Sequence, residues 1–206
     1  MKYNERDRHT SDKMSIVRSS LRSNPLLTGA VGATCIAGAC VSLSNALVLI
    51  AILAFLLPVV GVLSSAQGEH FGSLIRPAFY CVVSGVIVFL ISLFIDNVIA
   101  DGSVLRLGIY APLLAVDGLV MARTDEDSPI LTARESLTDS FTVLACAAFV
   151  ALPVGIIREL LITGRLFSRV AQTDSPFARP FFGFLLCGFM LALLRVISEK
   201  IIKEDV

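Results

Sequence analysis

The longest stretch without charge constrains most strongly what this chain can fold into. Asn24 to Ser64 are 41 consecutive residues without Asp, Glu, Lys, Arg or His. At about 1.5 Å per residue, a single helix over this stretch would be roughly twice as long as the hydrocarbon core of a bilayer is thick. The stretch must therefore fold back on itself, and its only polar break is "VSLSN" at Val41–Asn45. It predicts two helices that each cross a membrane.

Further charge-free runs lie at Pro77–Ile95, Ser140–Ile157 and Pro180–Leu194. The chain is 55% hydrophobic and 17% charged, with a mean hydropathy of +0.82, which exceeds what the core of a soluble domain of this size needs. We therefore predict an all-α polytopic membrane protein with six transmembrane helices. Their approximate positions are 25–42, 46–64, 77–95, 104–122, 140–158 and 180–198.

The charged residues define the ends of this membrane domain. A polar tail at 1–23 precedes a membrane domain at 24–200, and a short charged tail follows at 201–206. The membrane domain divides into halves of three predicted spans each, at about 24–96 and 104–200. The net charge is zero, so nothing in the sequence indicates a nucleic-acid partner.

The distribution of basic residues predicts the orientation in the membrane. With the N-terminal tail in the cytoplasm, 12 of the 17 Lys and Arg residues fall on the cytoplasmic side. Both termini are then cytoplasmic, as an even number of spans requires. The five basic residues assigned to outer loops are Arg106, Arg158, Arg165, Arg169 and Arg179.

The first and fourth predicted spans are interrupted. The first contains "GAVGATCIAGAC" at 29–40, which is almost entirely small residues, and the fourth contains Asp117 and Gly118. Both spans also contain "PLL", at 25–27 and at 112–114. An odd number of spans per half places the two halves in opposite orientations. We therefore expect two inverted three-helix repeats with broken first and fourth helices, and a site near the middle of the membrane.

Several segments of this chain resemble a known family. They are "NPLL" at 24–27, "VDGLVMAR" at 116–123, "SLTDSF" at 136–141 and "GIIRELLITGRLF" at 155–167. Together they resemble the D/E-type small membrane subunits of the Rnf and Nqr electron-transport complexes, over most of residues 24–200. The resemblance implies the six-helix inverted repeat, and pairing with a homologous inverted subunit about a pseudo-twofold axis.

The resemblance also implies a function and a place in the cell. Two paired subunits would share an iron–sulfur cluster of the [2Fe-2S] type. Each subunit would give two cysteines to it, one from each of its two broken helices. Other subunits of the complex would supply and remove electrons while Na⁺ or H⁺ crosses the bacterial cytoplasmic (inner) membrane. No phosphate-binding loop, nucleophile elbow or H-E-x-x-H pair occurs in the chain, so we expect a non-autonomous subunit without catalytic residues of its own.

The cluster ligands are the point at which the chain departs from the family pattern. The two ligand positions fall on Thr34 and Gly118, and Cys35 lies one position after the first. Iron–sulfur clusters need thiolate or imidazole ligands, so Cys35 is the one weak candidate for a cofactor or metal ligand. The alternative is that Cys35 and Cys40 only pack, because five residues apart they lie about 140° around a helix.

Asp117 is the main candidate for an ion or proton site. A carboxylate within a membrane span marks a functional site by default. Two alternatives are that Asp117 caps the half-helix that follows it, or that it is the counter-charge of an arginine in a partner. In each case Gly118 would permit the bend.

Three charged residues around the fifth predicted span are candidates for partner contacts or structural roles. Arg158 and Glu159 could form an ion pair or a membrane-interface anchor, or could orient the partner subunit. Asp139 lies just before that span and could cap its N-terminus.

These observations predict a membrane subunit of an Rnf/Nqr-type complex that translocates Na⁺ or H⁺. Two alternatives stay open. The chain could be a divergent relative without a cluster that carries an ion or small solute, with Asp117 as the binding group. It could also be a purely structural membrane subunit.

Overall fold

Four long helices and several short ones make up the fold. The computed structural model describes residues 24–67, 75–98, 102, 104–122, 133–167 and 175–203, and in this part of the chain every regular element is helical. The long helices are α4 (Leu43–Gln67), α5 (Ile75–Val98), α8 (Ala133–Thr163) and α9 (Pro180–Lys203). The short ones are α2 (Pro25–Gly29), α3 (Ala33–Ala39), η1 (Leu105–Leu107), α6 (Tyr110–Leu113), η2 (Leu114–Val116), α7 (Gly118–Met121) and η3 (Pro176–Ala178). The all-helical prediction is confirmed.

The four long helices are long and apolar enough to cross a membrane. The spans lie at Leu43–Ser65, Ile75–Asn97, Arg134–Thr163 and Pro180–Lys200, and coincide with the predicted second, third, fifth and sixth spans. The 31 residues of α8 correspond to about 46 Å of helix, which is more than the roughly 30 Å of a bilayer core. The polar start of α8 therefore extends beyond the hydrocarbon.

The first predicted span is divided into α2 and α3, as its small residues suggested. The side-chain oxygen of Asn24 accepts a hydrogen bond from the backbone N–H of Leu26 (3.0 Å) and Pro25 occupies the first position of α2, so the helix starts with a typical cap. Ala30 then adopts the left-handed conformation (φ 52°) and ends α2. Gly32, the N-cap just before α3, has a φ of 87°, a backbone angle that residues with a side chain rarely adopt.

The fourth predicted span is likewise divided. One turn of η1 is followed by α6 and η2, which run on from one another until Asp117. The backbone of Asp117 is extended (φ −64°, ψ 143°), and α7 begins at the next residue. The predicted spans at 25–42 and 104–122 are therefore chains of short helices rather than single crossing helices.

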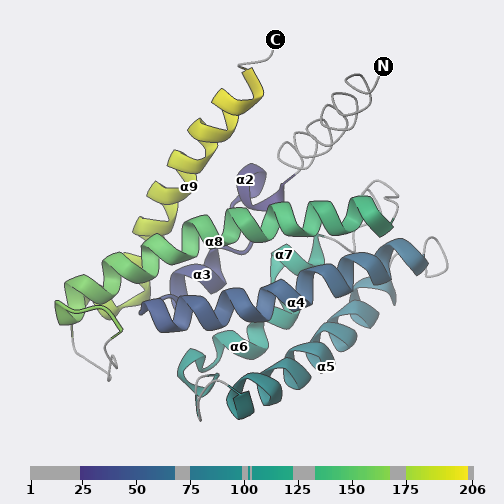
Figure 1. Ribbon diagram of the computed structural model, residues 1–206, viewed down its shortest axis with the longest axis horizontal. Coiled ribbons are helices and arrows are strands. Elements are labelled where there is room, and N and C mark those ends of the chain that lie inside the picture. The colour runs from purple at the N-terminus through teal and green to yellow at the C-terminus, as the bar shows by residue number, and fades with distance from the viewer. Residues whose placement is uncertain are drawn as a thin grey trace, which may run out of the picture.

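Helices α4 and α8 form the centre of the fold and run antiparallel, side by side (Figure 1). The backbone N–H of Leu43, at the start of α4, donates to Glu159 near the end of α8 (2.9 Å). Towards the other ends of the two helices, the Ser140 hydroxyl donates to the Leu57 carbonyl oxygen (3.2 Å).

Two glycines allow this close approach, one from each helix. A Cβ atom placed on Gly61 of α4 would lie 2.8 Å from the Oγ atoms of both Ser136 and Ser140, at the start of α8. A Cβ atom placed on Gly155 of α8 would lie 3.0 Å from the Ser42 carbonyl oxygen, just before α4. The two glycines are 94 residues apart, and so are Ser42 and Ser136. The crossing therefore has a glycine at each of its two close approaches.

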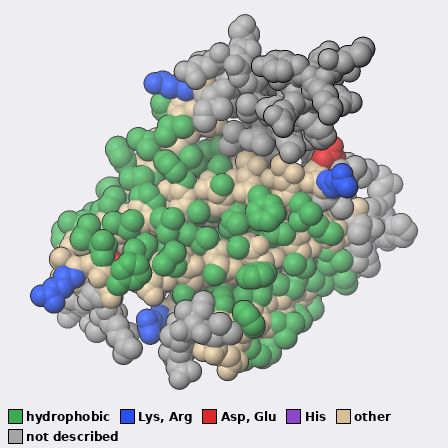
Figure 2. Space-filling model, viewed as in Figure 1, with side chains coloured by type: hydrophobic (Ala, Val, Ile, Leu, Met, Phe, Trp, Pro, Cys, Tyr) green, Lys and Arg blue, Asp and Glu red, His purple; other side chains and the backbone are tan. Residues whose placement is uncertain are grey.

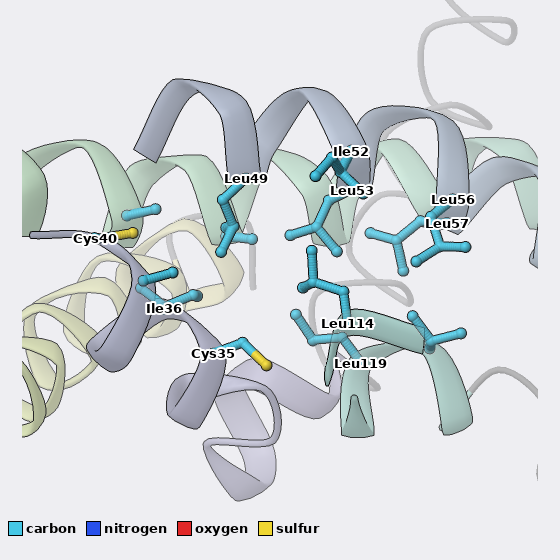
Figure 3. Packing of buried hydrophobic residues seen from close by; sticks show 14 of the residues in the cluster. Cys35, Ile36, Cys40, Leu49, Ile52, Leu53, Leu56, Leu57, Leu114 and Leu119 are labelled. Carbon is cyan, nitrogen blue, oxygen red and sulfur yellow. The ribbon is translucent and has the colours of Figure 1, made fainter. Parts of the chain in front are cut away.

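The short helices pack against the long helices of the other half of the chain. Helix α3 lies against α9, and η2 and its neighbours lie against α5 (Figure 1). Between them, the buried core gathers leucine and isoleucine side chains of α4 against those of α3, η2 and α7 (Figure 3).

The outer surface is apolar as well. Figure 2 shows hydrophobic side chains covering the middle of the visible face, with Lys and Arg side chains near its edges. Large side chains of α5 and α9 remain exposed, among them Phe89, Phe94, Leu185 and Phe189. An exposed apolar surface of this extent suits lipid or a partner in the membrane.

Candidate functional site

The two helix breaks, 85 residues apart in sequence, are in direct contact. A Cβ atom placed on Gly32 would overlap the Leu119 side chain and lie 2.9 Å from Asp117 Oδ2. A Cβ atom placed on Gly118 would overlap Val31 Cγ1. Each break therefore depends on a glycine whose missing side chain leaves room for the other break.

Asp117 lies at this junction and is buried, with 5% of its surface exposed. Its Oδ2 atom accepts a hydrogen bond from the backbone N–H of Leu119 (3.3 Å), so Asp117 caps α7. The structural role foreseen for this residue is thus present, and its proposed role as an ion or proton site stays a prediction.

Cys35 comes from the first turn of α3 and meets Asp117. Its side chain is fully buried and lies close enough to the Asp117 carboxylate to interact with it electrostatically. In Figure 3 its sulfur points away from α3 towards the segment that carries Leu114 and Leu119. Thr34, the preceding residue, is exposed. The structure therefore brings together the two site residues that the sequence singled out in separate spans.

The residues at this junction do not fit a shared iron–sulfur cluster. Thr34 faces outward but has a hydroxyl in place of a thiol, whereas the thiol of Cys35 faces inward to Asp117. At Gly118 a cysteine would need space that Val31 occupies. In the described part of the chain, no three His, Cys, Asp or Glu side chains are grouped so that they could hold a metal ion. No step of the function below is therefore assigned to a cluster on this chain.

Arg158 and Glu159 lie inside α8 and are fully buried. The assignment of Arg158 to an outer loop is wrong, because α8 continues to Thr163 instead of ending at residue 158. The orientation of the chain in the membrane stays a prediction. Both side chains bind backbone groups of other helices, at the corner between α3 and α4.

Asp139 does not cap the helix that it was expected to precede. Helix α8 begins at Ala133, so Asp139 lies in its second turn. Residues 133–139, before the apolar run, contain no proline or glycine, and they continue the helix outward. The first turn carries Glu135 instead, which suits the positive end of the helix dipole.

Sequence reasoning missed the residues that make room for these contacts. Gly32 was visible only as one of several small residues in the first span, and Gly183 of α9 gave no signal at all. A Cβ atom on Gly183 would overlap the Ala37 carbonyl oxygen and lie 2.8 Å from Arg158 Nη1. Only the packing of α9 against α3 and α8 shows why this position is a glycine.

Comparison with known proteins supports the resemblance drawn from the motifs. A search of curated proteins gives no match. The profile of the family described as "Rnf-Nqr subunit, membrane protein" matches residues 13–196, which extends from within the polar tail almost to the end of α9. The match includes both helix breaks, the α4–α8 crossing and the buried Arg158 and Glu159. The chain therefore belongs to the Rnf-Nqr family of membrane subunits.

Proposed function

We propose that this chain is a membrane subunit of an ion-translocating oxidoreductase of the Rnf/Nqr type, and that it forms part of the ion path at Asp117. The observation that carries the proposal is the junction of the two breaks, where the buried carboxylate meets the Cys35 thiol. A charged group in this position is costly within a membrane, and interrupted helices that meet in a membrane protein are typical of ion-binding sites.

The proposal includes an inverted repeat of the halves 24–96 and 104–200. It is supported by the antiparallel α4 and α8, by the matching glycine contacts of Gly61 and Gly155, and by the packing of each broken segment against the other half. Related halves of opposite orientation form a site that can open to either side by rocking against one another.

The surroundings of Asp117 favour a proton over Na⁺ as the translocated ion. Its carboxylate accepts the backbone N–H of Leu119 (3.3 Å), and the side chain beside it is the thiol of Cys35, which is also a donor. Alkali and alkaline-earth ions need several oxygen ligands, as unwound backbone carbonyls supply in transporters. This carboxylate lacks the additional oxygen ligands that Na⁺ needs, whereas binding a proton requires none.

The exposed side of the breaks indicates a protein partner. Thr28, Gly29, Ala30 and Thr34 are exposed beside the first break, and Val116 is exposed beside the second. Irregular backbone at membrane depth is tolerated only where protein or a water-filled cavity covers it. We propose that a homologous inverted subunit covers this face, in the bacterial cytoplasmic membrane, with both termini of this chain in the cytoplasm.

Asp117→Asn tests the ion path. The asparagine amide oxygen still accepts the Leu119 N–H bond, so the fold should persist, but the side chain no longer exchanges a proton. We expect redox-driven proton flux to fall about a hundredfold or more. The measurement is acidification of proteoliposomes that contain the purified complex.

Asp96→Asn is the matched control. Asp96 Oδ1 accepts a hydrogen bond from the backbone N–H of Val104 (3.0 Å) and so is a second carboxylate that binds a backbone N–H, away from the breaks. The Asp96→Asn variant should leave the proton flux unchanged. Full flux in Asp117→Asn would instead support a purely structural subunit.

A second candidate function is a carrier that has lost its link to redox chemistry, which the poor fit of the cluster ligands favours. Cys35→Ser in the purified complex separates the possibilities, with Cys81→Ser as the control. On the main proposal, iron and visible absorbance co-purify with the complex and are the same in both variants. A carrier would contain no iron at all. Loss of iron in Cys35→Ser alone would show that Cys35 is a ligand after all.

A further inference from the structure

Arg158 makes a complete set of hydrogen bonds to backbone carbonyl oxygens. Its Nη1 atom donates to Ala37 (2.7 Å) and to Cys40 (3.3 Å), at the C-terminal end of α3. Its Nε and Nη2 atoms donate to three carbonyls of η3 and the residue after it: Phe177 (3.2 Å), Ala178 (2.9 Å) and Arg179 (3.2 Å). A guanidinium has five N–H groups, and here each has an acceptor.

Glu159 binds the other side of the same corner. Its Oε2 atom accepts the backbone N–H of Leu43 (2.9 Å), the first residue of α4. The last carbonyls of a helix carry partial negative charge and its first N–H groups carry partial positive charge. The neighbouring cation and anion of α8 therefore match the end of α3 and the start of α4.

Gly183 keeps this arrangement possible. It belongs to α9, which packs on α3, and a side chain there would displace the Ala37 carbonyl from Arg158. A buried charge pair is costly unless its geometry is satisfied, and a hydrophobic pair of similar volume is often as stable. Stability alone thus gives little reason for two charged residues at this place.

We propose that Arg158 and Glu159 are positioning residues that hold α3 in place for the contact between Cys35 and Asp117. Helix α3 has seven residues, about 10 Å of stiff rod. Its C-terminal end is fixed by Arg158, and its N-terminal end carries Cys35 and Gly32 to the second break. Only the importance of this contact for ion translocation rests on the proposed function. The position of Cys35 beside Asp117 can be measured without ion flux.

The test measures the Cys35 thiol directly. In the full chain with Cys40, Cys81, Cys146 and Cys187 replaced by alanine, the infrared S–H stretching band reports only Cys35. Asp117→Ala provides the band of a thiol that has lost the neighbouring carboxylate. In Arg158→Lys the charge is kept, but three donors on a single nitrogen cannot reach both α3 and η3. We expect the band to shift to the position seen in Asp117→Ala.

Arg165→Lys is the matched control, because Arg165 is exposed just beyond the end of α8. The S–H band of Arg165→Lys should lie at the same position as that of the chain in which only the four other cysteines are replaced. A band that is unchanged in Arg158→Lys, even with lowered thermal stability, would overturn the proposal in favour of a merely structural role.

If Arg158→Lys does not fold, Glu159→Gln decides. Glutamine keeps an acceptor for the Leu43 N–H and removes only the charge, so we expect a smaller shift in the same direction. An unchanged band in that variant would overturn the proposal. These band positions do not depend on ion transport. If Asp117→Asn kept full proton flux, the proposed ion path would be wrong, but the infrared test of Arg158 and Glu159 would still give a result.

Discussion

Replacing Gly183 by alanine is expected to lower the stability of this protein more than any other single methyl group added to α9. The new Cβ atom would overlap the Ala37 carbonyl oxygen and crowd Arg158 Nη1. Overpacking of a core typically costs about 1–3 kcal/mol, and a buried charge that loses partners about 3–5 kcal/mol. We therefore expect a combined loss of about 4 kcal/mol or more, or failure to accumulate in the membrane.

Gly188→Ala is the control, because Gly188 lies on the same helix with nothing within 4 Å of a Cβ atom. There, alanine improves helix propensity by about 1 kcal/mol and should leave the protein equal or slightly more stable. Thermal unfolding of the purified chains in detergent, followed by circular dichroism, gives the comparison. Equal midpoints for the two variants would contradict the role given to Gly183.

Replacing Gly32 by alanine should disrupt the junction of the breaks. At φ 87° a side chain costs about 1–2 kcal/mol in backbone strain, and here it would also overlap Leu119 and approach Asp117 Oδ2 to 2.9 Å. The total loss should be about 3 kcal/mol or more, since overpacking adds to the strain. Because the carboxylate must move, proton flux should be lost in any protein that still folds.

Gly164→Ala separates strain from crowding. Gly164 also has a positive φ (69°), but nothing lies within 4 Å of its Cβ position. Gly164→Ala should therefore lose only the stability that backbone strain costs, about 1–2 kcal/mol, and should keep its proton flux. Similar unfolding midpoints and similar flux in both variants would mean that the two breaks do not depend on their contact at Gly32.

The candidate site illustrates how far a single sequence can lead. Asp117 and Cys35 were identifiable separately, because a carboxylate is rare in an apolar run and a cysteine lies next to a family ligand position. That they lie beside one another follows only from the fold. The sequence shows that Gly118 stands where the family pattern has a cysteine. The structure adds that Val31 fills the space that a cysteine side chain would need there.

Errors arose where helix ends were inferred from polarity. Arg158 and Asp139 both lie at the edges of an apolar run, so they were placed outside the helix or at its cap. Helix α8 in fact runs from Ala133 to Thr163. Polar residues continue a helix when no proline or glycine stops it, and hydropathy reports the membrane boundary rather than the end of the helix.

The sequence by itself determined that the chain is an all-helical membrane protein, where its long helices lie, and that its first and fourth segments are interrupted. These properties depend on local features, namely the length of apolar runs and the placement of proline, glycine and capping residues. Only the tertiary structure decided which distant groups meet: the two breaks at Asp117, and the corner of α3 and α4 at Arg158 and Glu159. Backbone carbonyl and N–H groups occur at every residue, so no sequence pattern indicates which of them a buried charge will bind.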